Sequence, residues 1–287
     1  MRSYSPFLFL IPAIILIILT GLYPLVHSLY LSLVNIKLGL PYKLRFVGLH
    51  NYMKAIMDER FLSDLLLTYK YAAICVLLQL VFGLVISLTI TSRIVSEKMR
   101  NITLSILIAP LLFPYVAVGQ LFRLILSTDF GLVNYILNVL GMQAPDWFGN
   151  ASTAFLSIVL IDVWQNTSFF VLLLTAAILS IPTDYYEAAA IDGAGPIQTF
   201  KFITLPYIYP AIFFAVIFRF LGSLKAWDYV AVTTYGGPGT ATELISWYTT
   251  FLAFYKYELS YSTAVAWIFN LTMLVLTLLL IRIVWRR

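Results

Sequence analysis

Six long apolar segments alternate with polar ones along the 287-residue chain. The apolar segments lie near residues 7–33, 66–92, 102–126, 152–180, 208–234 and 261–284. Each is longer than the roughly 20 apolar residues that a helix needs to cross the hydrocarbon core of a bilayer. The pattern predicts an all-α integral membrane protein, a single domain with six transmembrane helices. Prolines predict kinks in the first helix, at Pro12 and Pro24, and in the third, at Pro110 and Pro114.

The composition agrees with a membrane protein. The chain is 61% hydrophobic and 11% charged, whereas a soluble domain carries about 25% charged residues. The net charge of +5 predicts no nucleic-acid partner, because the basic residues sit mostly in loops and ends, where they orient a membrane protein. One cysteine, Cys75, and two scattered histidines, His27 and His50, predict neither an intrachain disulfide nor a metal site. We expect the lipid bilayer to be the main solvent.

Lysine and arginine counts predict the side that each loop faces. With the N-terminus inside, eight basic residues are cytoplasmic and six are external. The cytoplasmic set is Arg2, Arg93, Lys98, Arg100, Lys201, Arg282, Arg286 and Arg287, and the external set is Lys37, Lys43, Arg45, Lys54, Arg60 and Lys256. The margin is small, but the cytoplasmic residues include those that flank helices directly. We therefore expect both termini, and the polar segment after the fourth helix, to be cytoplasmic.

That polar segment, EAAAIDGAGPIQTFKFITLP, runs from Glu187 to Pro206 between the fourth and fifth apolar segments. Pro182 predicts the end of the preceding helix. Thr183 or Asp184 can cap a new helix, and Asp184 followed by Glu187 resembles a capping box. The segment thus predicts a short helix that begins near residue 183.

The alanines and glycines that follow predict how this short helix ends. Alanine favours helix strongly, and Ala188, Ala189 and Ala194 would let another protein's backbone approach closely. Gly193 permits the turn out of the helix, and the Gly195-Pro196 pair suits a bend followed by the first position of a second short helix. The prediction over 183–206 is helix, turn, helix, a form that can be presented to a groove in a partner protein.

The order of these residues resembles the EAA loop of permease subunits in bacterial and archaeal ABC importers. Glu187-Ala188-Ala189 is followed after three residues by Gly193, and after nine more by Ile203-Thr204-Leu205-Pro206. Composition alone would favour an ordinary cytoplasmic loop, but the full spacing favours the resemblance. It implies a short cytoplasmic coupling helix between helices four and five, gripped by an ATPase. The implied coupling residues are Glu187, Ala188, Ala189, Asp192, Gly193 and Ala194.

Three further motifs are similar to those of the sugar-type branch of this family. They are F-V-G-L-x-N-Y at Phe46–Tyr52, G-L-x-N at Gly131–Asn134, and Thr-x-Gly-Gly-Pro-x-x-x-Thr at Thr234–Thr242. The last is typical of the subunit that resembles the first permease of the maltose importer. On physical grounds alone, the first two motifs would serve equally as interfacial helices with aromatic anchors.

The resemblance implies several partners in the cell membrane of a bacterium or archaeon. They are a second permease subunit, which completes a heterodimer, two ATPase subunits and an external solute-binding protein. The turn Gly236–Gly239 lacks the lysine of a phosphate-binding loop of the G-x-x-x-x-G-K-[ST] kind. We therefore expect no cofactor on this chain, with ATP and Mg²⁺ at the partner ATPases, and no enzymatic activity of its own.

Charged residues inside the apolar segments are expensive and usually functional or paired. Asp162 lies about ten residues from the outer end of the fourth helix, roughly 15 Å deep, and Arg219 lies at a similar depth in the fifth. We expect these two charges to approach each other, and the residues leave open whether the pair is static or takes part in gating. Lys225 and Asp228, three apart, are expected to pair locally on one helical face.

A sugar needs hydrogen-bonding groups and flat aromatic faces in a wet cavity. The candidate pathway residues are Gln79, Gln120, Trp164, Asn166, Trp227, Tyr248 and Asn270. Each one alone is more often a packing residue or a residue that joins helices.

The favoured function is the permease subunit of an ATP-driven importer for a sugar or related polyol. A glycerol-phosphate-like ester, or another small polar solute, is the alternative substrate. An ion-coupled secondary transporter would need paired carboxylates or broken helices at mid-membrane, and one central aspartate supports it weakly. An intramembrane enzyme is disfavoured, because the apolar segments hold no Ser/His, His-Glu-x-x-His or paired-carboxylate arrangement.

Overall fold

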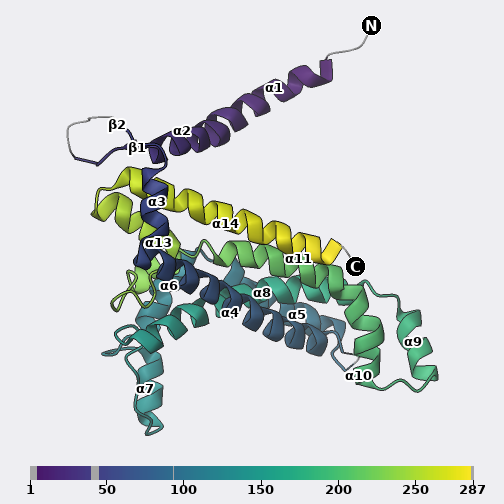
Figure 1. The fold of residues 1–287 in the computed structure, drawn as a ribbon. Helices are drawn as coiled ribbons and strands as arrows, with labels where there is room; N and C mark the ends of the chain where they lie inside the picture. Colours follow the sequence, from purple (N-terminus) through teal and green to yellow (C-terminus); the bar gives the residue numbers. More distant parts are fainter. Residues whose placement is uncertain (1–4, 40–44, 93, 286–287) are drawn as a thin grey trace. The chain divides into compact units, whose positions relative to one another are not determined.

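The computed structural model describes residues 5–39, 45–92 and 94–285, which are mainly helical (Figure 1). The chain divides into two compact units. The first unit combines the two ends of the chain, residues 1–65 and 245–287, and the second holds residues 66–244. The basic residues Arg2, Lys43, Arg93, Arg286 and Arg287, which enter the orientation argument, lie outside the described residues.

The first unit is built from a long N-terminal helix, a connecting segment and the C-terminal helices. Its elements are α1 (Ser5–Ile17), η1 (Ile18–Leu22), α2 (Tyr23–Ser32), β1 (Val34–Asn35), β2 (Arg45–Phe46), α3 (His50–Ile56), the start of α4 (Glu59–Ile90), α13 (Ile245–Thr250), η4 (Phe251–Tyr255) and α14 (Leu259–Trp285). Helix α14 packs against α2 and α3. The Trp267 indole N–H donates to Ser28 Oγ at 3.2 Å and joins α14 to α2.

The first predicted membrane helix is one helical path that widens near its middle. Element η1 is a π-helix, in which the Tyr23 N–H bonds to the carbonyl of Ile18, five residues earlier. Pro24 follows directly, and its ring would crowd the carbonyl four residues before it. The wider turn therefore accommodates Pro24, whereas Pro12 lies inside α1, which continues as an α-helix.

One short strand pair departs from the all-α prediction. Strands β1 and β2 are antiparallel, with Val34 opposite Phe46 and Asn35 opposite Arg45. The two strands lie between α2 and α3 in the chain. Phe46 of β2 is the first residue of the F-V-G-L-x-N-Y motif, whose Gly48 adopts a φ of +56°.

The second unit contains the remaining helices. They are the rest of α4, α5 (Glu97–Ile108), η2 (Ala109–Leu112), α6 (Tyr115–Ile125), α7 (Leu132–Val139), α8 (Ala151–Leu179), α9 (Thr183–Ile191), α10 (Pro196–Thr199), η3 (Phe200–Thr204), α11 (Leu205–Ser223) and α12 (Asp228–Thr233). Helix α8 is the central one: its most apolar stretch is 67% buried, and it packs against α5, α6, α11 and α12.

The packing around α8 depends on close approach of helices. Phe170 and Leu174 are fully buried in a cluster with Val76 and Ala215. A Cβ on Gly83 would lie 2.4 Å from the Cβ of Phe170, so α4 can pass α8 only with glycine at this position. In a bilayer, where lipid tails are as apolar as leucine, such van der Waals packing and interhelical hydrogen bonds hold helices together.

The third predicted membrane helix is broken rather than kinked. Helix α5 with η2 and helix α6 meet at a bend of 97°. Pro114 precedes α6, and the carbonyl of Phe113, at the break, accepts a hydrogen bond of 2.8 Å from the Gln165 side chain on α8. A neighbouring helix thus satisfies a backbone carbonyl at the break.

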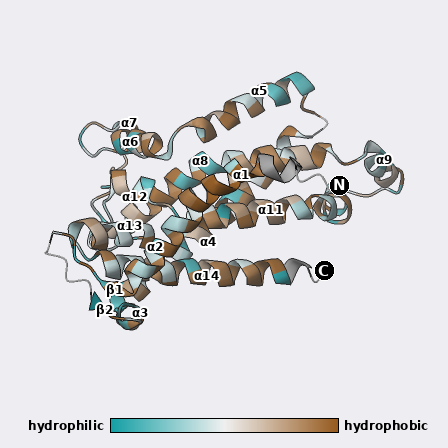
Figure 2. Cartoon of the chain, turned by 90° about the horizontal axis from the view of Figure 1, so that it is seen from above, coloured by the Kyte–Doolittle hydropathy of each residue, from teal (hydrophilic) through white to brown (hydrophobic). Residues whose placement is uncertain are grey.

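Five helical segments of the described chain are long and apolar enough to cross a membrane, or six if the bent pair counts as one span. The five are Leu10–Ser32, Glu59–Ile90, Ala151–Leu179, Pro196–Thr233 and Leu259–Arg282. Figure 2 shows the hydrophobic character of these helices. The fifth predicted span is also interrupted, because α11 ends at Ser223 and α12 begins at Asp228.

Candidate functional site

A buried polar cluster, called here the polar node, lies at the centre of the second unit. Its charged pair is Asp162 on α8 and Arg219 on α11. The Arg219 Nη2 lies 2.8 Å from Asp162 Oδ1, and the two side chains are only 8% and 1% exposed. The structure therefore brings together the two intramembrane charges that their sequence depth predicts to meet.

The Asp162 carboxylate has further donors besides the guanidinium. Its Oδ1 accepts from Gln79 Nε2 at 3.2 Å and from Asn166 Nδ2 at 2.6 Å. Its Oδ2 accepts from the Tyr71 hydroxyl at 2.9 Å and from Ser223 Oγ at 3.3 Å. These donors satisfy the roughly four acceptor positions of a carboxylate. The polar node thus solvates a buried charge pair and joins α4, α8 and α11.

The polar node extends towards α6 and α12. The Tyr229 hydroxyl donates to Gln165 Oε1 at 2.8 Å and accepts from Asn166 Nδ2 at 3.2 Å. The Tyr115 hydroxyl donates to Asn166 Oδ1 at 3.3 Å, and its ring meets that of Tyr229 edge-on. A continuous hydrogen-bonded path therefore links five helices of the second unit.

Sequence reasoning missed several members of the polar node, although helical spacing carries a signal for them. Tyr71 lies eight residues before Gln79, which places both on one face of α4. Ser223 lies four residues after Arg219, and their side chains bond at 3.1 Å. A search for polar residues at spacings of four and eight from the predicted Gln79 and Arg219 would have found Tyr71 and Ser223.

The seven predicted pathway residues are divided between the two units. Gln79 and Asn166 belong to the polar node, whereas Gln120 is exposed on α6. Trp164 is 43% exposed and packs edge-on against Phe122, and Trp227 is half-buried before α12. Tyr248 and Asn270 belong to the first unit. Asn270 is exposed, and its side chain bonds to the Ala266 carbonyl of its own helix.

Tyr248 instead holds a carboxylate at the start of α4. Its hydroxyl donates to Asp58 Oδ2 at 2.9 Å, as the Tyr261 hydroxyl does at 2.6 Å, while the Arg60 N–H donates to Oδ1. Burial alone would raise the pKa of Asp58, but the two tyrosine hydroxyls and two backbone N–H groups outweigh it and hold the pKa below its ordinary value of 3.8. Asp58 therefore fixes α4 to α13 and α14 as a carboxylate.

The predicted local pair of Lys225 and Asp228 is wrong for the described structure. Helix α11 ends at Ser223, Lys225 lies in a turn with an exposed side chain, and Asp228 begins α12. The two residues therefore do not share a helical face, and no ion pair joins them in the described chain.

The segment after α8 forms the predicted helix, turn and second helix. Helix α9 ends in a Schellman motif: the Gly193 N–H bonds to the Ala190 carbonyl, the Ala194 N–H bonds to the Ala189 carbonyl, and Gly193 has a φ of +74°. Pro196 is the first residue of α10, and the Gln198 side chain accepts from the Gly195 N–H at 2.9 Å.

Two details of this segment differ from the prediction. Helix α9 has Pro182 as its N-cap and no side-chain cap hydrogen bond, so neither Thr183 nor the Asp184–Glu187 pair caps it. Ala189 is buried at 8% exposure, so it packs inward and supports the helix rather than presenting a docking face.

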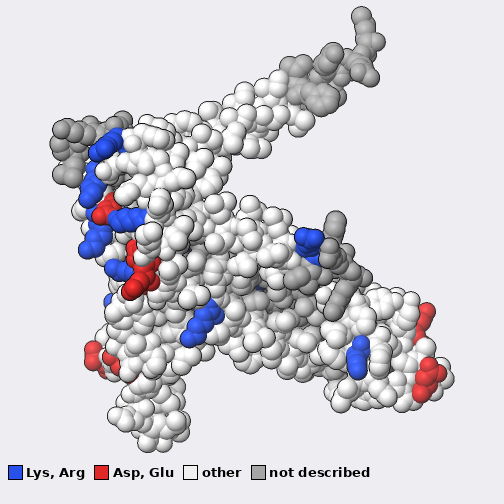
Figure 3. Space-filling model, viewed as in Figure 1, with Lys and Arg blue, Asp and Glu red and all other residues white. Residues whose placement is uncertain are grey.

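Helix α9 is anchored to the helices that precede and follow it. The Tyr186 ring packs against the buried cluster of Ile178, Ile181 and Ile208, and its hydroxyl lies 3.1 Å from Thr204 Oγ1. The opposite side is open, with Glu187, Ala188 and Asp192 exposed. In Figure 3 acidic side chains gather over α9, at the lower right. The helix thus has one fixed face and one free, acidic face.

The three remaining motifs have internal structural roles. The Asn51 side chain donates to the Ser32 and Val34 carbonyls, and the Asn134 side chain donates to the Ser127 carbonyl. In the glycine-rich turn, Thr242 Oγ1 is hydrogen-bonded to Thr234 Oγ1 at 2.7 Å and to the Gly237 carbonyl at 2.8 Å. The two threonines of that signature therefore close the turn.

The fold is that of the membrane subunits of ABC importers. The structure is similar to two structures of a bacterial ABC transporter that imports the acidic polysaccharide alginate. In the first, the TM-score is 0.87 at 22% identity, and the match covers 99% of this chain and 96% of the other. The second, in complex with an alginate pentasaccharide-bound periplasmic protein, gives a TM-score of 0.83 at 22% identity and covers 97% and 93% of the two chains.

Sequence comparison identifies the family. Residues 79–286 match the model of the binding-protein-dependent transport system inner membrane component. The chain is 34% identical to the trehalose/maltose transport system permease protein MalF of Thermococcus litoralis, over 88% of this chain and 83% of MalF. It is 33% identical to the sulfoquinovosyl glycerol transport system permease protein SmoG of Agrobacterium fabrum, over 96% and 89%.

The chain therefore belongs to the family of binding-protein-dependent transport system inner membrane components. It is a multi-pass membrane protein and a permease subunit of an ABC importer.

Proposed function

We propose that this chain forms half of the pathway by which a sugar or related polyol enters the cell, driven by ATP. A second permease subunit completes the pathway, two ATPase subunits bind ATP and Mg²⁺, and an external solute-binding protein delivers the substrate. The names of MalF and SmoG, which refer to trehalose or maltose and to a sulfoquinovosyl glycerol, support a glycoside substrate.

The observation that carries the proposal is the geometry of α9. Its inner face is fixed by Tyr186 and Ala189, while Glu187, Ala188 and Asp192 remain exposed. A helix with one anchored face and one free face suits insertion into a groove of a partner. Because α9 is attached to both α8 and α11, displacement by an ATPase would move these helices with it.

In this proposal α9 lies on the cytoplasmic side, as do both termini. ATP binding closes the ATPase pair, and the coupling segment 183–206 follows as a rigid body and switches the helices from inward-open to outward-open. Uptake results because the ATPases bind the two states with different affinity.

The polar node contributes to the proposal through its charge. Arg219 is neutralised by Asp162 at 2.8 Å, and its guanidinium also donates to Gln79 and Ser223. A neutralised arginine offers little attraction to an anionic substrate, so the buried charges favour a neutral sugar or polyol over a glycerol-phosphate-like ester.

The proposal is tested by purifying the chain with its neighbours from native membranes and reconstituting the complex. We expect two ATPase chains and a second permease to co-purify, and sugar uptake to require ATP and the binding protein. Ala188→Trp should abolish coupled uptake, because it adds a bulky ring to the free face of α9, whereas the conservative Ala188→Ser should retain it. Uptake that continues without any ATPase chain would refute the proposal.

A further inference from the structure

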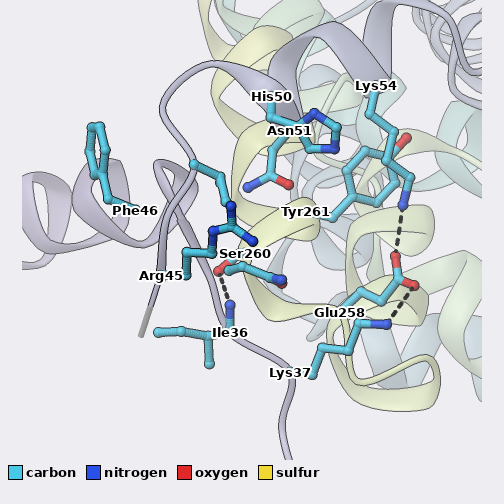
Figure 4. Close-up of a pocket in the computed structure, with 12 residues that line it drawn as sticks. Ile36, Lys37, Arg45, Phe46, His50, Asn51, Lys54, Glu258, Ser260 and Tyr261 are labelled. Carbon is cyan, nitrogen blue, oxygen red and sulfur yellow. Dashed lines mark hydrogen bonds and ion pairs between the residues drawn. The ribbon is translucent and has the colours of Figure 1, made fainter. Parts of the chain in front are cut away.

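A cavity of about 500 Å³ lies in the first unit (Figure 4). Its walls come from the segments around β1 and β2, from α3 and from the start of α14. Four of its lining side chains carry basic groups, namely Lys37, Arg45, His50 and Lys54, and one is acidic, Glu258. We call this cavity the basic pocket.

The walls of the basic pocket are held by hydrogen bonds. The Ile36 N–H donates to Ser260 Oγ at 2.9 Å, and the Leu38 N–H donates to the Tyr257 carbonyl at 2.9 Å. Tyr257 has a φ of +58°, a left-handed conformation that few non-glycine residues adopt. The turn at Tyr257 positions the next residue, Glu258, so that its carboxylate lies in the pocket.

Glu258 occupies only part of the basic pocket. Its carboxylate lies 3.1 Å from Lys54 Nζ and 3.9 Å from Lys37 Nζ, and both contacts are drawn in Figure 4. Lys54 has a second partner, because its ammonium lies 3.9 Å from the centre of the Tyr261 ring. Lys37 is 52% exposed and keeps a long contact, and Arg45 has no ionic partner among the described residues.

The result is a local excess of positive charge with a carboxylate already seated in it. Three permanent cations, Lys37, Arg45 and Lys54, face one anion. Arginine presents paired N–H donors that match a carboxylate in a bidentate way, and Arg45 is available for this. The chemistry of the basic pocket therefore fits a second carboxylate, held by Arg45 and Lys37 beside Glu258.

We propose that the basic pocket receives an acidic side chain of the external solute-binding protein. This inference rests on the proposed function, because the pocket must face outwards. Most of the residues that line the pocket lie within 35–37 and 45–54, between the candidate spans Leu10–Ser32 and Glu59–Ile90, so it lies where a soluble partner can reach it. Glu258 acts as a resident competitor that holds Lys37 until the partner's carboxylate arrives.

The experiment measures the ATPase activity of the reconstituted complex against the concentration of its binding protein. Arg45→Gln and Lys37→Gln should each raise the half-saturating concentration about two- to fivefold, the effect expected for a solvent-exposed ion pair. Glu258→Gln should lower it by a similar factor, because it removes the competing carboxylate. Lys256→Gln is the matched control: its ammonium lies over the Phe251 ring, outside the basic pocket, and the value should not change.

Salt and a small carboxylate separate the possible occupants. The half-saturating concentration should rise with ionic strength, and less steeply in the Arg45→Gln, Lys37→Gln double variant. Glucuronate that binds the complex without binding protein, in an Arg45-dependent way, would overturn the proposal in favour of a small-molecule site. An unchanged half-saturation in Arg45→Gln would overturn the docking proposal alone. A binding protein that fails to stimulate the wild-type complex would overturn the proposed function together with it.

Discussion

Removal of both charges from the polar node should destabilise the protein by less than the sum of the two single removals. Arg219 is the cation at the Asp162 carboxylate, at 2.8 Å, and the side chains are 8% and 1% exposed. In Arg219→Met the carboxylate keeps only neutral donors. In Asp162→Asn the guanidinium keeps its bonds to Gln79 and Ser223 but loses its counter-charge.

The expected magnitude follows from burial. Breaking a buried ion pair by removing one partner costs about 3–5 kcal/mol, because the remaining charge is uncompensated. The double variant Asp162→Asn, Arg219→Met leaves no such charge, so its cost should be less than the sum of the two single costs by about 1–3 kcal/mol. Arg123→Met is the control. Arg123 is exposed and bonds only a backbone carbonyl and a ring, so its removal should cost under about 1 kcal/mol.

The assay is a double-mutant cycle on the free energy of unfolding, measured by titration with a denaturing detergent in mixed micelles and followed by circular dichroism. A double variant whose loss of stability equals the sum of the two single losses would show that the charges do not interact, and the account of the polar node would fail. ATP-driven uptake by the folded variants then separates a static pair, whose loss leaves the rate unchanged in correctly folded protein, from a gating pair.

Two further changes test other parts of the structure. Gly193→Ala should destabilise the end of α9 by about 1 kcal/mol and reduce coupled uptake, because Gly193 has a φ of +74°. Gly195→Ala is the control and should have neither effect, because Gly195 has a φ of −72°. Equal thermal stability of the two variants would contradict this reasoning. Asp58→Asn should lower the thermal stability near pH 7. The difference from wild type should begin to shrink as the pH falls below about 4 and vanish below the folded pKa, because a carboxyl with a lowered folded pKa stabilises only while it is ionised. A difference that does not shrink on acidification would show that the ionised carboxylate is not what fixes α4.

Most of the helices follow from the hydrophobic pattern alone. The segments near 152–180 and 261–284 correspond to α8 and α14 within two residues at each end. Neither run contains proline or glycine, so each continues as one helix. Where proline interrupts a run, the pattern gives the location of a disturbance but not its size. The 97° bend near Pro114 is accompanied by a hydrogen bond from Gln165 that the sequence does not reveal.

Some residues of the candidate site could be predicted from the sequence and others could not. The meeting of Asp162 and Arg219 follows from depth, because an isolated charge in a bilayer is too costly to leave unpaired. Ser223 could not be assigned from its own chemistry, since serine hydroxyl groups in membrane helices usually bond their own backbone. The failure of the Lys225 and Asp228 pair has a local cause: a three-residue spacing predicts contact only inside a continuous helix, and α11 ends between them.

The basic pocket was also beyond sequence reasoning. Lys37, Arg45 and Lys54 entered the sequence argument only as charges that orient the chain. Glu258 lies more than 200 positions later, and its arrival depends on the turn at Tyr257. Long-range contacts of this kind are set by the packing of α14 against α2 and α3.

The most direct test of the central claim is cross-linking from the free face of α9. The Asp192→Cys variant, in which the native Cys75 is buried, is labelled with a benzophenone maleimide in inverted and right-side-out vesicles and then irradiated. We expect labelling only from the cytoplasmic side, with a photochemical adduct to an ATPase chain that mass spectrometry identifies. Labelling from the outside, or a complex that transports sugar yet never yields that adduct, would contradict it.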